Sequence, residues 1–149
     1  MGAKSQFVFT TAVMRPADRT EGCIVARILL AEDEDSLRGF LIRALAQEGH
    51  DVVAAADGAA ALDNLTRDQG RYDLLLTDIR MPVMDGIALA LAAARDHPDL
   101  TIVLMTAFAD QRERAHGLDA LIHDVITKPF SLAEIKLAVK EALATRARQ

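Results

Sequence analysis

Short apolar runs alternate along the chain with longer segments of helical period, and this alternation restricts the fold more than any other feature. From Arg27 onward, five runs have the length of strands: Ile28-Leu29-Leu30-Ala31, Val52-Val53-Ala54-Ala55, Leu74-Leu75-Leu76, Ile102-Val103-Leu104-Met105 and Val125-Ile126. Most are continuous rather than alternating, which is typical of parallel strands that are covered on both faces. The sequence therefore predicts an α/β fold with a five-stranded parallel sheet.

The segments between the runs have the one-sided apolar spacing of amphipathic helices. The clearest examples are Leu37, Phe40, Leu41, Ala44 and Leu45, and then Ile135, Ala138, Val139, Ala142 and Leu143. Ser131 and Glu134 have the spacing of a reciprocal cap for the last helix. We expect a doubly wound (βα)5 unit over residues 27–146, with right-handed crossovers and the flavodoxin-like strand order 2-1-3-4-5.

Composition narrows the classes of function. The 149 residues allow one domain, and 17 basic against 22 acidic side chains give a net charge of -5, which argues against a nucleic-acid surface. The single cysteine, Cys23, excludes an internal disulfide framework and favours a reducing, cytoplasmic setting. Because no apolar run approaches the roughly 20 residues that span a bilayer, we expect no membrane partner.

The ends of the chain are interpreted separately. Residues 1–26 show no sustained period and are expected to form a loose N-terminal tail, with 147–149 as a C-terminal tail. Two other interpretations of the tail stay open: a secretory signal around Phe7-Val8-Phe9, which Thr10 and Thr11 interrupt, or a start-site artefact with translation beginning at Val25. We expect no output domain after the last helix, so that any signal is transmitted by protein contact.

Polar residues follow four of the predicted strands. These are Glu32-Asp33, Thr77-Asp78, Thr106-Ala107 and Thr127-Lys128-Pro129. In an open parallel sheet the carboxyl ends of the strands meet at one edge, so these groups should converge there. Three carboxylates in one crevice repel one another, and one lysine together with one divalent cation would balance them. Oxygen ligands favour Mg²⁺.

The residues predicted to bind Mg²⁺ are Glu32, Asp33 and Asp78, directly or through water, and the backbone carbonyl of Arg80. Asp78 precedes a sharp turn and is expected to be exposed as a nucleophile for phosphoryl transfer. Thr106 and Lys128 would then contact oxygens of the phosphoryl group.

These residues and their spacing resemble the receiver domain of bacterial two-component response regulators over 27–146. The motifs that match are Glu32-Asp33, the loop from Asp78 through Met81-Pro82 to Asp85-Gly86, Thr106-Ala107 and Lys128-Pro129-Phe130. The resemblance implies that Asp78 is phosphorylated by a phosphohistidine on a histidine kinase or histidine phosphotransferase, and that the bond before Pro129 is cis. It also implies a switch that assists its own phosphorylation and dephosphorylation, rather than an enzyme.

Two positions depart from the usual receiver pattern. Val125 stands where many receivers have an aromatic switch residue, so we hypothesise that Thr106 still moves on phosphorylation while the neighbouring surface repacks in another way. Phe108 is bulky at a position that tunes the access of water to the acyl phosphate, and Arg80 flanks the same channel. Both are interpreted as tuning residues.

Two stretches, 26–34 and 110–120, further resemble a stand-alone receiver that controls regulated proteolysis in the bacterial cell cycle. This likeness implies an adaptor that is active when unphosphorylated, with ClpX of the ClpXP protease as its partner.

Two alternatives remain. One is an adaptor that does not depend on phosphorylation. The other is a phosphohydrolase of the haloacid dehalogenase type, with Asp33 as nucleophile and Asp35 as acid and base, although Asp35 should begin a helix.

Overall fold

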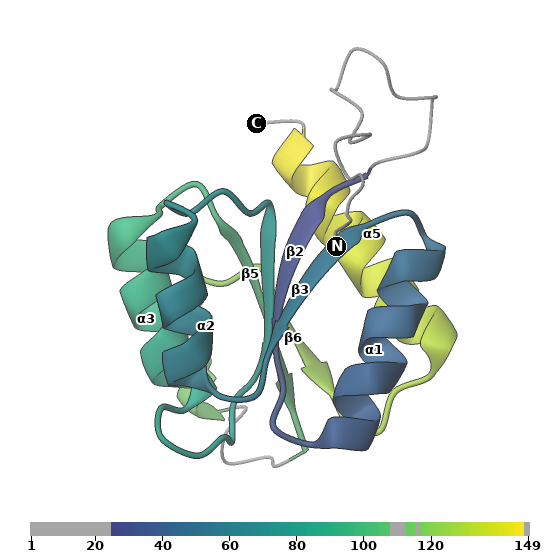
Figure 1. Ribbon diagram of the computed structural model, residues 1–149, viewed down its shortest axis with the longest axis horizontal. Coiled ribbons are helices and arrows are strands. Elements are labelled where there is room, and N and C mark those ends of the chain that lie inside the picture. The colour runs from purple at the N-terminus through teal and green to yellow at the C-terminus, as the bar shows by residue number, and fades with distance from the viewer. Residues whose placement is uncertain (1–24, 108–112, 116, 148–149) are drawn as a thin grey trace, which may run out of the picture.

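The computed structural model describes residues 25–107, 113–115 and 117–147. Five parallel strands form one sheet: β2 (Arg27–Ala31), β3 (Asp51–Ala55), β4 (Leu74–Asp78), β5 (Thr101–Thr106) and β6 (Asp124–Thr127). Their order is β3-β2-β4-β5-β6, which is the predicted order 2-1-3-4-5 (Figure 1). β2 is central, with Ile28 in register with Val52 on one side and with Leu74 on the other.

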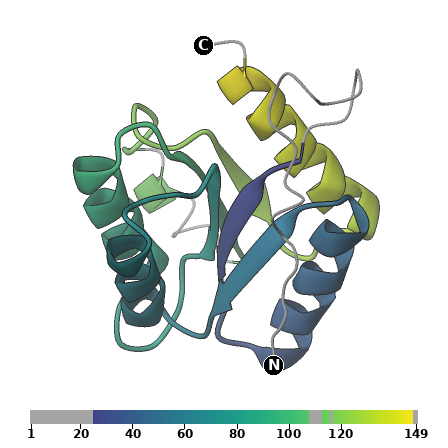
Figure 2. The same ribbon diagram turned by 45° about the horizontal axis from the view of Figure 1, so that its top comes forward.

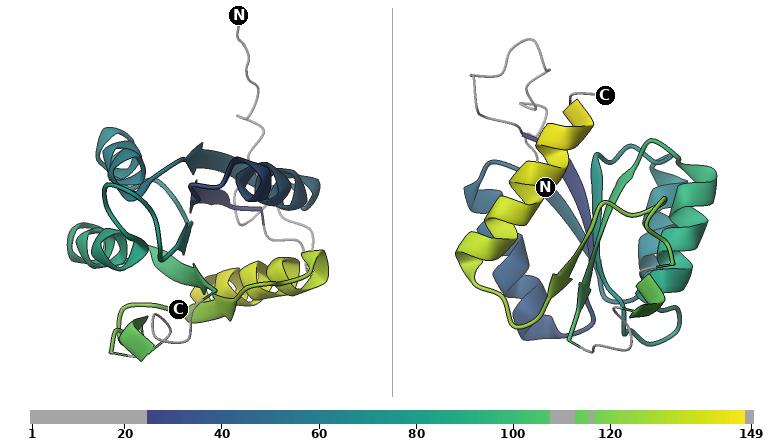
Figure 3. Two further views of the ribbon diagram at one scale, coloured as in Figure 1. Left: turned by 90° about the horizontal axis from the view of Figure 1, so that it is seen from below. Right: turned by 180° about the vertical axis from the view of Figure 1, so that it is seen from behind.

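Helices cover both faces of the sheet. α1 (Asp35–Gln47) and α5 (Leu132–Ala147) lie on one face, and α2 (Gly58–Arg67) and α3 (Gly86–Asp96) lie on the other (Figures 1 and 3). The helix predicted between β5 and β6 falls partly on 108–112 and 116, outside the described residues, whereas 113–115 are helical. Among the helices described, none combines the length and the apolar character needed to cross a membrane.

The side chains of each strand point alternately into two apolar cores. Leu29 and Leu75 pack with α2 and α3, whereas Ile28 and Leu74 pack with α1 and α5. The turned view in Figure 2 shows the twisted sheet between these two layers. Because helices cover both faces of the sheet, the ends of the strands are where polar side chains can gather next to solvent.

The two outermost strands of the sheet are less buried than the sequence predicted. All five residues of β4 are buried, as expected for a strand that is covered on both faces. β3 and β6 are only partly buried, because each has one neighbouring strand and borders solvent along its other side. The apolar runs alone do not distinguish a central strand from an edge strand.

The predicted cap of the last helix is present, and a second helix is capped as well. Ser131 N donates to Glu134 Oε1 at 2.8 Å and Glu134 N donates to Ser131 Oγ at 3.1 Å, which confirms the reciprocal cap of α5. Asp57 caps α2 by accepting from Ala60 N at 2.8 Å. These caps begin the helices next to the carboxyl edge of the sheet and so fix the loops that carry its polar residues.

The opposite, amino edge of the sheet holds a separate polar network. Asp73 Oδ2 accepts from Arg27 N at 2.8 Å, and Asp73 Oδ1 pairs with Arg146 Nη1 at 3.0 Å. The Arg27 guanidinium lies 4.6 Å from the centre of the Tyr72 ring. Two hollows of about 550 and 540 Å³ also lie at this edge, and both are lined in part by Arg146. They are therefore remote from the acidic residues at the carboxyl edge.

Candidate functional site

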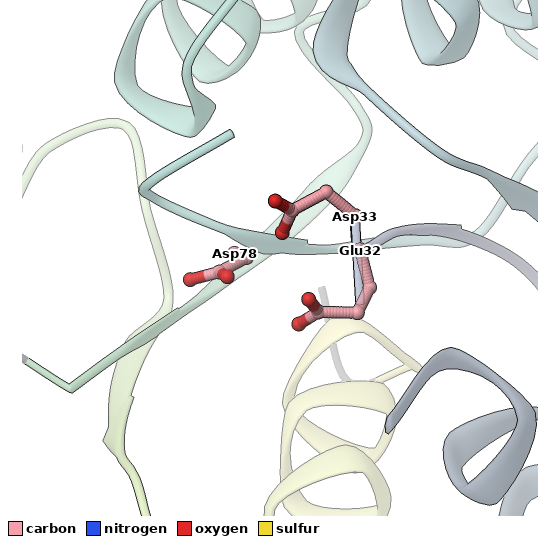
Figure 4. Close-up of side chains that lie close together, drawn as sticks. All are labelled: Glu32, Asp33 and Asp78. Atoms are coloured by element: carbon pink, nitrogen blue, oxygen red, sulfur yellow. The ribbon is translucent and has the colours of Figure 1, made fainter. Parts of the chain in front are cut away.

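Three carboxylates meet at the carboxyl edge of the sheet. Glu32 and Asp33 directly follow β2, and Asp78 ends the neighbouring strand β4. One oxygen of each lies within 4.8 Å of the others, and all three carboxylates are directed to the same region (Figure 4). The convergence expected from strand ends in a parallel sheet is therefore present.

Lys128, which directly follows the outermost strand β6, joins this cluster. Its Nζ lies 3.0 Å from Glu32 Oε1 and 3.0 Å from Asp78 Oδ2. The side chain thus reaches across β5, which separates β6 from β4. The Lys128–Pro129 peptide bond is cis, as the family resemblance implies.

The carboxylates differ sharply in exposure. Asp78 is only 7% exposed, so the expectation of an exposed nucleophile is wrong. β4 is the middle strand of the sheet, the loop after it folds back to the strand end, and Lys128 contacts the carboxylate, so Asp78 is recessed. Glu32 is 1% exposed, and its Oε2 also accepts from Glu34 N at 3.0 Å. Asp33 is exposed and is the most accessible of the three.

The charges at the site do not balance without a cation. Burial raises the pKa of Glu32, and the negative charge of Asp78 raises it further, against the hydrogen bond from Glu34 N and the contact with Lys128. Burial alone would lower the pKa of Lys128, but hydrogen bonds and charge from Asp78 and Glu32 outweigh it and raise that pKa. Three carboxylates beside one ammonium leave two negative charges, which one divalent cation would neutralise. An oxygen-only ligand set fits Mg²⁺.

The loop that follows β4 is packed tightly against Asp78. Ile79 N donates to Met105 O at 3.0 Å, and Gly86 N donates to Ile79 O at 2.7 Å, which closes the loop at its base. A Cβ at Gly86 would lie only 2.0 Å from the Asp78 carbonyl oxygen. A residue without a side chain is therefore required at this point, and the loop holds the Asp78 backbone in place.

A family model described as the response regulator receiver domain matches residues 28–140. The chain belongs to this family. Among its relatives, the response regulator receiver protein CpdR of Brucella abortus is 39% identical over 78% of this chain and 96% of CpdR. The transcriptional regulatory protein PrrA of Mycobacterium tuberculosis is 34% identical over 84% of this chain, which spans only 53% of PrrA.

Solved structures give the same receiver fold. The response regulator TrrA of Thermotoga maritima, in complex with Mg²⁺-BeF, matches with a TM-score of 0.70 and 31% identity over 78% of this chain and 97% of TrrA. A CheY-like receiver domain protein of Methanospirillum hungatei matches with a TM-score of 0.76 and 25% identity over 84% of this chain and 98% of that protein. Receiver domains generally bind Mg²⁺ in an acidic pocket, and this receiver domain has a group of three carboxylates at the corresponding strand ends.

The other predicted site residues of this receiver domain lie around the same edge. Thr106 ends β5 and is buried, and its carbonyl accepts from Lys128 N at 2.8 Å. Ala107 and Arg80 are exposed, and Val125 lies half-buried in β6. Phe108 lies outside the described residues. The roles proposed for these residues in switching, in metal binding and in tuning hydrolysis stay predictions.

Arg38 is a neighbour of the site that the sequence analysis missed. Its Nη1 donates to the Glu32 carbonyl at 2.9 Å, and its Nη2 pairs with Asp35, so α1 holds the backbone of the acidic loop. A basic residue one helical turn after the first residue of α1 was the available signal. The same contact argues against the phosphohydrolase alternative, because the Asp35 side chain is 90% exposed and paired with Arg38 rather than placed beside a nucleophile.

Proposed function

We propose that this receiver domain is a phosphorelay switch in which Asp78 accepts a phosphoryl group from the phosphohistidine of a histidine kinase or histidine phosphotransferase, with Mg²⁺. The observation that supports this most directly is the position of the Lys128 ammonium, 3.0 Å from both Glu32 and Asp78. That ammonium lies beside the carboxylate oxygen that would become part of an acyl phosphate. The acidic trio within 4.8 Å adds the negative charge that a divalent cation requires.

Each residue has a distinct part in the proposed reaction. A carboxylate oxygen of Asp78 forms a bond to phosphorus while the phosphorus–nitrogen bond of the donor breaks, and the electron pair of that bond stays on the imidazole. Lys128 and the Thr106 hydroxyl stabilise oxygens of the phosphoryl group. Asp33, Asp78 and the Arg80 carbonyl hold Mg²⁺, whereas Glu32 contributes through its charge or through water, because both its oxygens already accept hydrogen bonds. When bound, the cation neutralises charge on the transferred group.

In this proposal the protein is not a turnover enzyme. Asp78 is consumed once per phosphorylation event, and the pocket accelerates both the gain and the later hydrolysis of the same phosphoryl group. The product of the reaction is thus a second state of the protein itself.

A gel assay tests Asp78 as the acceptor. The purified chain is incubated with phosphoramidate, with Mg²⁺ or with EDTA, beside an Asp78→Asn variant, and is resolved on a phosphate-affinity gel. The expected result is a retarded band only for the wild type with Mg²⁺. A band of equal intensity in Asp78→Asn, or in EDTA, would show that the acceptor or the metal requirement is wrong.

We further infer that the switch is read by protein contact, as in a CpdR-like adaptor of the ClpXP protease in cell-cycle proteolysis. The support is the 39% identity that extends over 96% of CpdR, a protein of comparable extent. In this interpretation the unphosphorylated form binds ClpX in the cytoplasm, and phosphorylation of Asp78 weakens the contact.

A binding experiment with ClpX distinguishes a phosphorylation-dependent adaptor from one that does not depend on phosphorylation. Fluorescently labelled chain is titrated with purified ClpX and a slowly hydrolysed ATP analogue, before and after treatment with phosphoramidate. Binding that is lost on phosphorylation, and kept by treated Asp78→Asn, supports the adaptor role. Equal binding in both states would indicate a phosphorylation-independent adaptor, and no binding in either state would refute ClpX as the partner.

A further inference from the structure

Val83, at the tip of the loop between β4 and α3, has an unusual conformation. Its φ angle is +70°, and Met84 N donates to Pro82 O at 2.8 Å across it, which makes a tight three-residue turn. The side chain of Val83 is 84% exposed, the highest value among the large exposed apolar residues that the structure describes. A β-branched residue therefore stands at a strained and fully accessible position.

Burial offsets little of the strain at Val83. A β-branched side chain in the left-handed region is crowded against its own backbone, whereas glycine and asparagine adopt this conformation readily. Burial could compensate, but a side chain that is 84% exposed gains little from burial. Valine is thus a costly choice here for stability alone.

Three other residues of the loop have evident structural roles. Met81 is only 9% exposed and packs into the core with α2 and α3. Asp85 caps α3 by accepting from Ala88 N at 2.8 Å, and Gly86 packs on the Asp78 carbonyl. A structural role of this kind is lacking for Val83 among the contacts of the described residues.

The loop also borders the route to Asp78. Its base is closed by the Gly86–Ile79 hydrogen bond directly after Asp78, a residue that is only 7% exposed. A protein that presents a phosphohistidine must bring its phosphorus atom to this recessed carboxylate, and so it must cover the surface beside the loop. A small phosphodonor, by contrast, has no protein surface to place against the loop tip.

We propose that Val83 is an apolar docking contact for the protein that donates the phosphoryl group, and that it selects among such donors. The inference rests on the proposed function of Asp78 and adds a recognition residue that takes no part in the chemistry. An exposed apolar side chain on a rigid turn loses little conformational freedom on binding, which suits a specificity contact. The cost in stability is retained because the contact is made only in the complex.

Two substitutions separate the conformational and the apolar properties of Val83. Val83→Asn keeps a residue that tolerates positive φ but removes the apolar contact, whereas Val83→Leu keeps an apolar side chain. Leu91→Gln is the matched control, because Leu91 is also an exposed apolar residue, 44% accessible, but lies within α3. All four proteins are phosphorylated with phosphoramidate, and with each histidine kinase and histidine phosphotransferase of the source organism, purified and phosphorylated.

The proposal predicts opposite effects on stability and transfer in Val83→Asn. Its thermal midpoint should rise by about 2–4 °C, as relief of strain in a protein of this size would give. Its kcat/KM with the preferred protein donor should fall by about tenfold, the range of an interface contact, while the rate with phosphoramidate stays unchanged. Val83→Leu and Leu91→Gln should transfer within about twofold of wild type.

The outcomes distinguish this inference from the function on which it rests. If neither phosphoramidate nor any protein donor modifies the wild type, the proposed function fails and the inference with it. If phosphoramidate works but no protein donor transfers, or if Val83→Asn transfers as fast as wild type, only the docking role is refuted. Equal losses with both kinds of donor would make Val83 a structural residue and would also overturn the inference.

Discussion

At the scale of single residues, the carboxyl edge of the sheet holds more negative charge than its lysine neutralises. Glu32 and Asp78 each contact Lys128 at 3.0 Å, and Asp33 adds a third carboxylate within 4.8 Å of them. The excess charge opposes folding in the metal-free protein. Cation binding and folding are therefore linked at this edge, since a cation that binds only the folded state stabilises it.

Replacement of Asp33 tests this linkage. Asp33→Asn should raise the free energy of unfolding in EDTA by up to about 1 kcal/mol, because it removes repulsion at an exposed position. It should also abolish most of the stabilisation that millimolar Mg²⁺ gives the wild type. Urea unfolding with and without Mg²⁺ measures both effects, with Asp63→Asn on the exposed surface of α2 as control. Unchanged Mg²⁺ stabilisation in Asp33→Asn would remove Asp33 from the metal site.

A second prediction at the scale of single residues concerns Tyr72 and the way in which the free energy of unfolding changes with pH. Burial raises the pKa of Tyr72, and the hydrogen bond from its hydroxyl to Asp68 raises it further. A raised pKa means that the fold favours the neutral phenol, so this stabilisation is complete below about pH 10 and is lost at higher pH. Relative to Tyr72→Phe, the wild type should lose about 1.4 kcal/mol between pH 8 and pH 11.

Denaturant unfolding of both proteins at the two pH values measures this difference. Tyr72 is the sole tyrosine of the chain, so the ultraviolet absorbance of tyrosinate reports its ionisation without interference. A difference between the two proteins that stays constant from pH 8 to pH 11 would show that Tyr72 ionises normally in the folded state.

The sequence predicted the residues of the acidic site but not their surroundings. Their convergence follows from strand order, because Glu32, Asp78 and Lys128 all lie at strand ends. The burial of Asp78 was missed, since it depends on how the later loop folds back over it. Likewise, the positive φ of Val83 cannot be read from a residue type that normally avoids it.

At the scale of elements, the loop from β4 to α3 is fixed by its close approach to the strand end. The shortest approach is at Gly86, where an added Cβ would lie 2.0 Å from the Asp78 carbonyl oxygen. Because backbone atoms on both sides make the contact, neither can move aside without shifting Asp78. The position of the acceptor thus depends on a glycine in the next helix.

Gly86→Ala should therefore weaken both the fold and the site. We expect a loss of about 1–3 kcal/mol in the free energy of unfolding, the range found for overpacking. Phosphorylation by phosphoramidate should slow by about tenfold or more, because small displacements of a reacting group are costly. Thermal denaturation and the phosphate-affinity gel measure the two effects.

Gly39→Ala in α1 is the matched control. Its added Cβ would meet only the end of the Arg43 side chain at 3.3 Å, so alanine should stabilise the helix by about 0.5–1 kcal/mol. Phosphorylation of this variant should match that of the wild type. If Gly86→Ala also left stability and phosphorylation unchanged, the loop would not be the support of Asp78.

The elements themselves were well predicted because their signals are local. The reciprocal Ser131–Glu134 cap, for example, follows from residue spacing at the start of α5. The exposure of β3 and β6 was not predictable in this way, since a strand becomes an edge only when the whole sheet is assembled. The network of Arg27, Tyr72 and Asp73 was missed for the same reason.

At the scale of the whole molecule, the two ends of the parallel strands differ in function: the carboxyl edge carries the site, and the amino edge stabilises the fold. The carboxyl edge carries the acidic cluster, whose unbalanced charge is a cost to the metal-free fold. The amino edge carries a network in which opposite charges are paired: Asp73 links the start of β2 through Arg27 N to the end of α5 through Arg146. Because the buried strands separate the edges, the amino edge can secure the fold without affecting the chemistry.

Asp73→Ala tests this division. The substitution removes the acceptor of Arg27 N and of Arg146 Nη1, and the loss of these partly exposed contacts should cost about 1–2 kcal/mol of unfolding free energy. The affinity for Mg²⁺, measured by calorimetry well below the melting temperature, should stay within about twofold of wild type, as should the rate of phosphorylation by phosphoramidate. Asp73→Asn, which keeps an acceptor for Arg27 N, should lose less stability. A fall in Mg²⁺ affinity that accompanies the loss of stability would mean that the two edges are coupled through the sheet, so that the amino-edge network is part of the switch.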